Sequence, residues 1–246
     1  MIVSTPAFVL KSFDFRETSR IVTFYTKSHG KIKGILKGIR KDSRKFGSSV
    51  DLFSLNDIVF YESRRSDLHL VSQCDLKAYH SSIRTDYKKN LAAHYAVELI
   101  DAVMPVESAN DDVYLLLGNY LDALEKASDV DKILHFFQIK ILLHSGFRPH
   151  LDACVQCGRE VSGRARFSLQ AGGLVCKECP AADNSFTIIS PGVIFSILHI
   201  EENHWRQCLN LGLTTSIKKE LRFVLNNFLL YHLEKKMNTE KYLQCV

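Results

Sequence analysis

The sequence lacks the short motifs that mark common nucleotide-binding and hydrolytic sites. It has no G-x-x-x-x-G-K-[ST] loop, no H-E-x-x-H and no G-x-S-x-G, the signatures of P-loop NTPases, zinc metalloproteases and α/β-hydrolases. Its carboxylates form no spaced cluster that would hold Mg²⁺, and its 10 histidines are scattered. These absences predict a protein that is not an enzyme and has no catalytic residues.

Long apolar runs are absent as well. No stretch approaches 18 apolar residues, the length at which a membrane-spanning helix is considered, so we expect no membrane contact. The N-terminus has no basic segment, and Lys11 interrupts its first apolar run, which does not fit a secretory signal peptide. We therefore expect a cytoplasmic protein, and 7 cysteines in a chain of 246 residues suit that reducing compartment.

The excess positive charge lies in the N-terminal third of the chain. The whole sequence has a formal net charge of +5. Residues 1–80 hold 14 Lys and Arg against 8 Asp and Glu, a net charge of +6, and residues 81–246 hold 18 against 19, a net charge of −1. This asymmetry predicts an anionic partner that binds the N-terminal third.

Four cysteines form the most specific motif. Cys154, Cys157, Cys176 and Cys179 follow the pattern C-x2-C-x18-C-x2-C, which is the spacing of a four-thiolate zinc site. Two residues between paired cysteines let one tight turn direct both sulfurs at one ion, and two such turns complete a tetrahedron. The stretches 166–169 and 174–175 between the pairs suit a short hairpin.

The same cysteines also allow two disulfides or a redox pair. Disulfides need an oxidising compartment, and a redox C-x-x-C normally occurs once, at a strand-to-helix turn. The pattern therefore favours one zinc ion per chain. Four thiolates would leave no coordination position for water, so the predicted zinc is structural rather than catalytic.

Residues 1–80 read as strands rich in β-branched and aromatic residues. The expected strands are 7–13, 21–26, 31–36 and 58–61, with a fifth in which Leu68, Leu70, Ser72, Cys74 and Leu76 fall on one face. A turn is expected at 28–30. Five short strands without a long helical pattern predict a small closed barrel such as the OB-fold.

From residue 81 the apolar period becomes helical. One stripe repeats every four positions: Leu91, Tyr95, Leu99 and Val103. It predicts a helix that stops before Pro105. A second helix is expected after the cap 110–112, and a third after Asp129 or Asp131, ending near Gly146. The third is apolar nearly all round, which predicts a place at the centre of the helical core.

Helical periodicity returns after the cysteines. Ser190 and Pro191 mark the start of one helix, and a last strong helix is expected from about 216 to 235. The predicted fold is therefore α+β. It has a five-stranded OB-fold barrel in residues 1–80 and an α-helical domain in residues 81–246, interrupted by a four-cysteine zinc module in residues 150–183.

Short matches in order along most of the chain carry a family resemblance. They are Glu17-Thr18-Ser19, Lys37-Gly38-Ile39-Arg40, Glu98-Leu99, Phe137, Leu142-Leu143, Gly146, Pro149, Cys154-x-x-Cys157-Gly158, Gly172-Gly173 and Cys176-x-x-Cys179. Together they resemble the family of the bacterial recombination mediator RecO. The chain departs from the family where Ile39 replaces a usual alanine and where Val50-Asp51-Leu52-Phe53 replaces Leu-Gln-Pro-Phe, which affects loops rather than the fold.

The resemblance implies a role in DNA repair and homologous recombination at the nucleoid. It implies the OB-fold, the helical domain and the structural zinc, together with binding of single- and double-stranded DNA and annealing of complementary strands. It also implies a complex with RecR, contact with the C-terminal tail of single-stranded-DNA-binding protein, and help in loading RecA onto DNA coated by that protein.

Basic residues concentrate where the third predicted strand leads into a loop. They are Lys31, Lys33, Lys37, Arg40, Lys41, Arg44 and Lys45, with Asp42 as the one acid among them. Alternation along the strand predicts that Lys31 and Lys33 face solvent while Ile32 and Leu36 fill the barrel. OB-folds bind single strands through charged grooves with aromatic stacking, so this set is the predicted DNA-binding site. Phe46 is the nearest candidate for stacking.

The family resemblance also places an acidic, apolar-ended partner tail in the helical domain. A helical groove binds such a peptide through apolar anchors and a basic rim. The last predicted helix offers basic residues beside its apolar stripe, and we expect Lys218 and Arg222 to contact the tail; a solvated charged face is the alternative for each.

Two other classes of function compete with DNA repair. OB barrels and zinc ribbons also serve RNA, so an RNA-binding or ribosome-associated factor is the alternative, and comparing the affinity for single-stranded DNA and RNA of one sequence separates the two. A metal-dependent nuclease with an unrecognised site is the other alternative, which incubation of labelled DNA with Mg²⁺ or Mn²⁺ tests.

Overall fold

The computed structural model describes residues 1–41, 46, 50–180, 186–234 and 236–243. Contacts divide the chain into two compact units, Met1–Lys126 with Lys241–Val246 and Ala127–Glu240. The domain ranges expected from the sequence, 1–80, 81–246 and 150–183, stay a prediction. Among the described residues, no helix combines the length and the apolar character that crossing a membrane requires.

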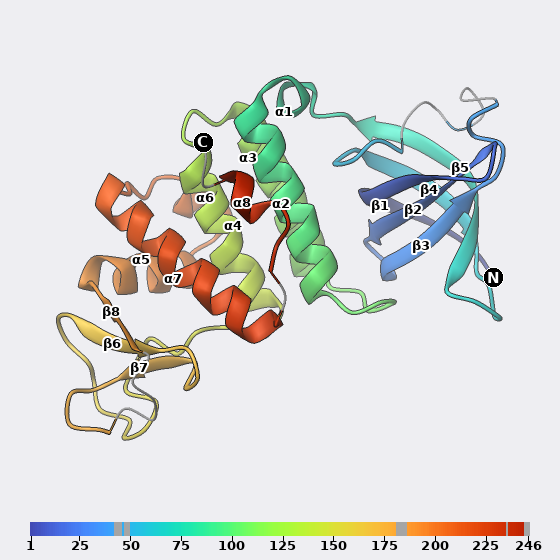
Figure 1. The fold of residues 1–246 in the computed structure, drawn as a ribbon. Coiled ribbons are helices and arrows are strands. Elements are labelled where there is room, and N and C mark those ends of the chain that lie inside the picture. The colour runs from blue at the N-terminus through green and yellow to red at the C-terminus, as the bar shows by residue number, and fades with distance from the viewer. Residues whose placement is uncertain (42–45, 47–49, 181–185, 235, 244–246) are drawn as a thin grey trace. The chain divides into compact units, whose positions relative to one another are not determined.

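The first unit begins with a closed five-stranded barrel (Figure 1). Its strands are β1 (Ile2–Phe15), β2 (Ser19–Thr26), β3 (Gly30–Leu36), β4 (Leu55–Tyr61) and β5 (Leu68–Ala78). Their order around the barrel is β1-β2-β3-β5-β4, with β3 and β5 parallel and the other neighbours antiparallel. The barrel confirms the predicted OB-fold class, and the pairing of β3 with β5 and of β1 with β4 closes it.

The barrel core follows the predicted alternation in β3. Ile32 and Leu36 are buried in the core cluster, whereas Lys31 and Lys33 are on the other side of the strand. The predicted turn before β3 requires a glycine at its end. Gly30 has φ 62°, and a Cβ there would collide with the backbone of Ser108.

The prediction that alternate residues of β5 share one face is wrong. Pairing shifts between β4 and β5, from Val59↔Gln73 to Phe60↔Val71, so Ser72 is the extra residue of a β-bulge. A bulge inverts the alternation beyond it. Cys74 is therefore buried in the barrel core, while Leu70 is on the outer surface, 39% exposed.

The rest of the first unit is helical: α1 (Ser81–Thr85), α2 (Tyr87–Val103), α3 (Asp111–Lys126) and the short α8 (Glu240–Leu243). The predicted end before Pro105 and the predicted cap of α3 are confirmed, since Asn110 Oδ1 accepts a hydrogen bond from the backbone N–H of Val113 at 3.0 Å. α3 packs on the barrel where the Phe8 and Tyr114 rings lie 5.2 Å apart. The sequence patterns did not predict α1 or α8.

The second unit contains α4 (Val130–His144), α5 (Pro191–Glu202), α6 (Trp205–Cys208) and α7 (Thr215–Leu233). α4 contacts α5 and α7, and every residue from Ile133 to Leu142 is buried, which confirms its predicted central place. Asp129 caps α4 by accepting from the N–H of Lys132, and Gly146, with φ 83°, follows its end as predicted.

Between α4 and α5 lies a small antiparallel sheet. Its strands are β6 (Ala165–Ser168), β7 (Gly173–Val175) and β8 (Phe186–Ile189), in the order β7-β6-β8. β6 and β7 confirm the predicted hairpin between the cysteine pairs, and β8 adds a strand that the sequence pattern did not predict.

Candidate metal centre and nucleic-acid interface

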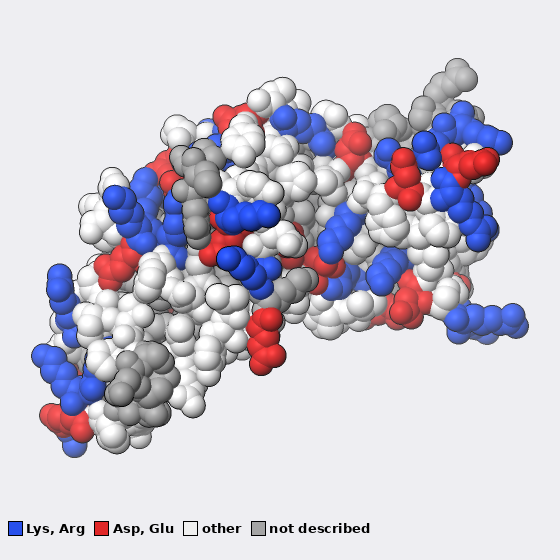
Figure 2. All heavy atoms as spheres, in the orientation of Figure 1, with Lys and Arg blue, Asp and Glu red and all other residues white. Residues whose placement is uncertain are grey.

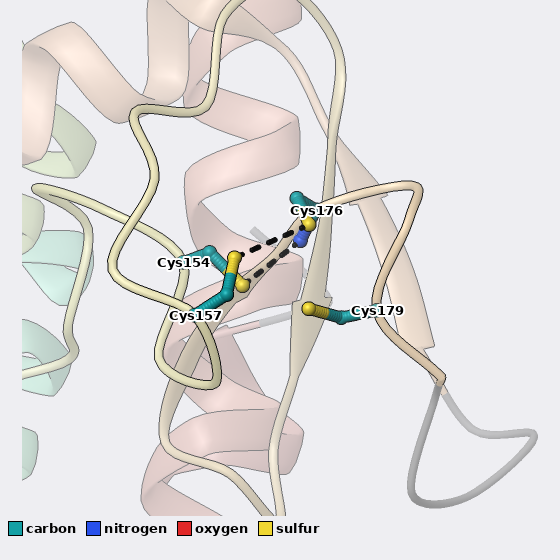
Figure 3. A group of neighbouring side chains, drawn as sticks. All are labelled: Cys154, Cys157, Cys176 and Cys179. Carbon is teal, nitrogen blue, oxygen red and sulfur yellow. Dashed lines mark hydrogen bonds between the residues drawn. The ribbon is translucent and has the colours of Figure 1, made fainter.

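The four cysteines of the C-x2-C pairs lie together in the second unit. Cys154 and Cys157 come from one loop and Cys176 and Cys179 from another, and their sulfurs point toward one another (Figure 3). All four Sγ atoms lie within 4.8 Å of one another, and those of Cys157 and Cys176 are 3.7 Å apart. Zinc–thiolate bonds of about 2.3 Å place tetrahedral sulfurs about 3.8 Å apart. The donor set and its spacing therefore fit a four-coordinate metal ion.

Backbone hydrogen bonds shape the loop that carries the first pair. Gly158, with φ 71°, donates from its N–H to the carbonyl of Cys154 at 2.8 Å, and Cys154 donates to the carbonyl of Arg159 at 2.8 Å. The loop joins the sheet through Val155, which donates to the carbonyl of Leu174 at 2.9 Å. The first pair is thus held against β7, which leads directly to Cys176.

Arg166 on β6 fixes the loop that carries the second pair. Its Nη2 donates to the carbonyl oxygens of both Cys176 and Cys179, the latter at 2.9 Å. The guanidinium carbon also lies 5.5 Å from the centre of the Phe186 ring. One guanidinium therefore joins both ends of the second C-x2-C turn.

Hydrogen bonds around Cys154 favour the thiolate form of its side chain. Burial raises its pKa, but hydrogen bonds from the backbone N–H groups of Cys176, Cys157 and Gln156 outweigh burial and lower the pKa to about 6. A thiolate is the form that binds a metal ion. The four residues can thus hold a metal, with Cys154 deprotonated near neutral pH.

The second candidate site is a groove on the outer face of the barrel in the first unit. It has a volume of about 630 Å³ and is lined by Lys11, Phe13, Ile21, Thr23, Lys31, Ile32, Lys33, Ser66, Asp67, Leu68, Asp101 and Val106. These residues come mainly from β1, β2 and β3 and from the loop between β4 and β5. In OB-folds, strands 2 and 3 and this loop bind oligonucleotides.

Strand register places two rows of side chains across this face. Phe13, Ile21, Ile35 and Leu70 are cross-strand neighbours on β1, β2, β3 and β5, and Phe13 is 52% exposed. The adjacent row contains Lys11, Thr23, Lys33 and Leu68 in the same strand order. An apolar surface therefore lies directly beside two lysines.

The predicted DNA-binding residues are distributed along and beyond β3. Lys33, Lys37, Arg40 and Lys41 are exposed, and the first three extend from mid-strand past the end of β3. In the part of the chain that the structure describes, Lys33, Lys37 and Lys41 form no ion pair. Arg40 lies 3.5 Å from Asp14. Arg44 and Lys45 lie outside the described residues.

Lys31 was expected to face solvent, but its side chain is largely buried and forms an ion pair. Its side chain is only 12% exposed and lies 3.4 Å from a carboxylate oxygen of Asp101 on α2. Its Nζ also donates to the Asp101 carbonyl at 2.6 Å. The ammonium group therefore lies against Asp101 of α2, and a contact between Lys31 and phosphate stays a prediction.

The suggestion that Phe46 stacks on bases is wrong. Its side chain is 2% exposed and belongs to the barrel core. Aromatic stacking needs an accessible ring, and Phe13 provides one in the groove. Alternation of exposed and buried residues along the first strand is a signal that could have pointed to Phe13, which lies outside the basic cluster at 31–45.

Further basic side chains lie in loops next to the groove. Arg64 and Arg65 are exposed in the loop between β4 and β5, and Arg16 is exposed between β1 and β2. On the visible face of the barrel, Lys and Arg side chains gather toward one end, with acidic side chains between them (Figure 2). The sequence analysis missed these three arginines because they lie outside the dense cluster at 31–45.

The two residues expected to bind a partner tail both form ion pairs within the second unit. Lys218 Nζ lies 2.9 Å from Asp129, and Arg222 Nη2 lies 2.9 Å from Asp131. Beside them on α7, Lys219 is exposed and Phe223 is 55% exposed. Lys219 and Phe223 are thus more exposed than the two predicted cations, and the role of Lys218 and Arg222 in tail binding stays a prediction.

Comparison with known proteins identifies the family. Residues 1–80 match the model for the N terminal of recombination protein O, and residues 84–241 match the model for its C terminal. The chain belongs to the RecO family. Membership identifies a DNA repair and recombination protein, as the resemblance of its motifs suggested.

Three proteins named DNA repair protein RecO are similar over nearly the whole chain. That of Alkaliphilus metalliredigens (strain QYMF) is 30% identical over 236 residues, covering 96% of this chain and 95% of its own. That of Moorella thermoacetica (strain ATCC 39073 / JCM 9320) is 30% identical, covering 96% and 88%. That of Syntrophus aciditrophicus (strain SB) is 30% identical, covering 97% and 94%. The RecO family thus accounts for both compact units.

Proposed function

We propose that this RecO family protein is a recombination mediator that binds single- and double-stranded DNA and anneals complementary strands. It acts as a binding protein and not as an enzyme, in the cytoplasm at the nucleoid. The observation that carries the proposal is the groove on the β2–β3 face, where an apolar row with an exposed Phe13 lies beside Lys33, a lysine that forms no ion pair among the described residues. Bases and phosphates need these two kinds of surface next to each other.

A single strand fits this surface in a definite way. Bases stack on Phe13 and lie over the apolar row, and phosphates contact Lys33 and then Lys37 and Lys41 beyond the end of β3. A strand rises about 3.3 Å per residue, so the four steps from Lys33 to Lys37 extend about 13 Å. Arg64 and Arg65 in the neighbouring loop provide further phosphate contacts at the groove.

The proposed partners follow from the family. The protein forms a complex with RecR, contacts the C-terminal tail of single-stranded-DNA-binding protein, and helps to load RecA onto DNA that this protein coats. For the tail we propose α7, where Phe223 provides an exposed apolar anchor and Lys219 a neighbouring cation. Lys218 and Arg222, which pair with Asp129 and Asp131, lie at the rim of this surface and contribute less than Lys219.

The metal in the four-cysteine module is proposed to be a structural Zn²⁺, one per chain. Four thiolates without another ligand fit Zn²⁺, which prefers tetrahedral sulfur coordination in structural sites. Bound there, the ion supplies a cross-link between the two C-x2-C loops. Cys154, Cys157, Cys176 and Cys179 hold it, and Arg166 holds the second loop in place.

An annealing assay tests the proposed function. Complementary oligonucleotides are coated with single-stranded-DNA-binding protein and mixed with this protein, with and without RecR. The proposal expects faster annealing than the coated strands show alone, and loss of that gain in the Phe13→Ala, Lys33→Ala double variant. Annealing no faster than the spontaneous rate would contradict the proposal.

The RNA-binding alternative makes a different prediction in a simpler assay. An RNA- or ribosome-associated factor would bind a single-stranded RNA more tightly than DNA of the same sequence. We expect comparable or tighter binding to DNA, measured by fluorescence anisotropy at one salt concentration.

A further inference from the structure

The groove on the barrel is lined by the carboxylate of Asp101, whose negative charge disfavours the binding of a polyanion. Asp101, near the end of α2, lines the groove with its side chain 17% exposed. Its Oδ2 accepts a hydrogen bond from Lys11 Nζ at 2.6 Å, and its Oδ1 lies 3.4 Å from Lys31 Nζ. One aspartate therefore forms ion pairs with two of the three lysines that line the groove.

The charges divide the groove into two parts. Beside α2, Asp101 pairs with Lys11 and Lys31. Lys33 shares a cross-strand row with Lys11 but lies two strands away on β3, and the other lining carboxylate, Asp67, is in the loop between β4 and β5. Lys33 lies in mid-strand and forms no ion pair among the described residues, and Lys37 follows beyond the end of β3. A phosphate that approached Lys11 or Lys31 would have to displace the carboxylate or lie beside it, whereas Lys33 and Lys37 are free to contact phosphate.

The Asp101 carboxyl is ionised in these pairs. Partial burial raises the pKa of the Asp101 carboxyl, but the hydrogen bond from Lys11 and the charges of Lys31 and Lys11 outweigh burial and hold its pKa below the usual value. Asp101 therefore stays ionised at neutral pH. A charged carboxylate in the groove repels phosphate at every pH where DNA binding would be measured.

We propose that Asp101 closes the part of the groove beside α2 to phosphate, so that a bound strand runs from Lys33 toward Lys37 and Lys41. This inference rests on the proposed DNA-binding function of the groove. It makes Asp101 a specificity-determining residue that limits the length and the affinity of the contact. A limited affinity suits a protein that anneals strands, because it must release them once they have paired.

Two substitutions, alone and combined, test the proposal in the full-length protein with a single-stranded oligonucleotide. Asp101→Asn should tighten binding and steepen the log–log salt dependence by about 0.7 for each lysine freed to contact phosphate. Lys11→Ala should leave the slope of the parent unchanged, yet remove the share of the gain that is due to Lys11, about 0.7 in slope, when added to Asp101→Asn. Asp75→Asn is the matched control, because this exposed aspartate of β5 lies outside the groove.

The outcomes separate this inference from the function on which it rests. A gain for Asp101→Asn no greater than for Asp75→Asn would overturn it, as would a loss of slope for Lys11→Ala in the parent equal to the loss for Lys33→Ala. The Lys11→Ala result decides the matter even when Asp101→Asn lowers the melting temperature. A parent protein that does not bind the oligonucleotide would contradict the proposed function itself.

Discussion

The metal module and the barrel groove bring their side chains together in opposite ways. In the module, two loops direct four sulfurs to within 4.8 Å of one another, and each pair is separated by only two residues. In the groove, the side chains come from several strands, and Lys31 meets Asp101 from 70 residues away. Ligands that are encoded locally follow from their spacing, whereas a free charge is known only when its distant partners are known.

Removing one metal ligand should produce the largest effect. Cys157→Ser should abolish zinc binding and lower the melting temperature markedly, because a structural zinc site contributes ~10 kcal/mol or more of apparent binding energy, much of it folding energy. Elemental analysis and thermal denaturation measure the two effects. Cys208→Ala, at a buried thiol outside the cluster, should retain the metal. Native protein purified without chelators and free of zinc would contradict the assignment.

The two phenylalanines should separate stability from binding. Phe46→Ala should destabilise the barrel by about 3–5 kcal/mol, as core truncations of aromatic residues do. Phe13→Ala should leave the melting temperature almost unchanged and weaken single-strand binding by about 1–3 kcal/mol, the usual effect of losing one stacked base. Denaturant titration and anisotropy measure them. Unchanged affinity for Phe13→Ala would remove that ring from the interface.

Arg166→Ala should weaken metal retention without removing a ligand. Loss of outer-shell support typically costs 10–100-fold in metal affinity, and here it frees the carbonyls of Cys176 and Cys179. Competition with a chromophoric chelator measures the change. Arg164→Ala is the matched control, because this exposed arginine forms no ion pair in the described part of the chain. Equal zinc release from both variants would show that Arg166 does not support the site.

Lys31→Ala should have the smallest effect on DNA. Its ammonium group already forms an ion pair with Asp101, so its loss should leave the salt dependence of single-strand binding unchanged. Lys33→Ala on the same strand should reduce the log–log slope by about 0.7. The same anisotropy titration covers both variants. A reduction for Lys31→Ala equal to that for Lys33→Ala would mean that the lysine leaves Asp101 for phosphate.

Much of the fold was predictable because its signals are local. The closed barrel, the caps at Asn110 and Asp129, and the hairpin between the cysteine pairs all follow from neighbouring residues. The inward face of β3 also followed, because nothing interrupts its alternation. The cysteine cluster required only that two tight turns meet, and the strands between them bring the turns together.

The errors arose where one distant or extra residue changed the outcome. Ser72 forms a bulge that moves Cys74 inward, and no local pattern marks it. Phe46 was taken as exposed because its neighbours in the chain are basic, yet it fills the barrel core. Lys31 was counted as free because its partner Asp101 belongs to α2, and only the fold brings the two together.

The salt dependence of single-strand binding tests the central claim most directly. A fluorescent oligonucleotide is titrated with the parent and with the Lys33→Ala, Lys37→Ala, Lys41→Ala triple variant at several salt concentrations. If these three unpaired lysines contact phosphates, the log–log slope should fall by about 2, at roughly 0.7 for each contact, with zinc content and melting temperature unchanged. A triple variant that binds with the affinity and slope of the parent would contradict the claim that this face of the barrel binds DNA.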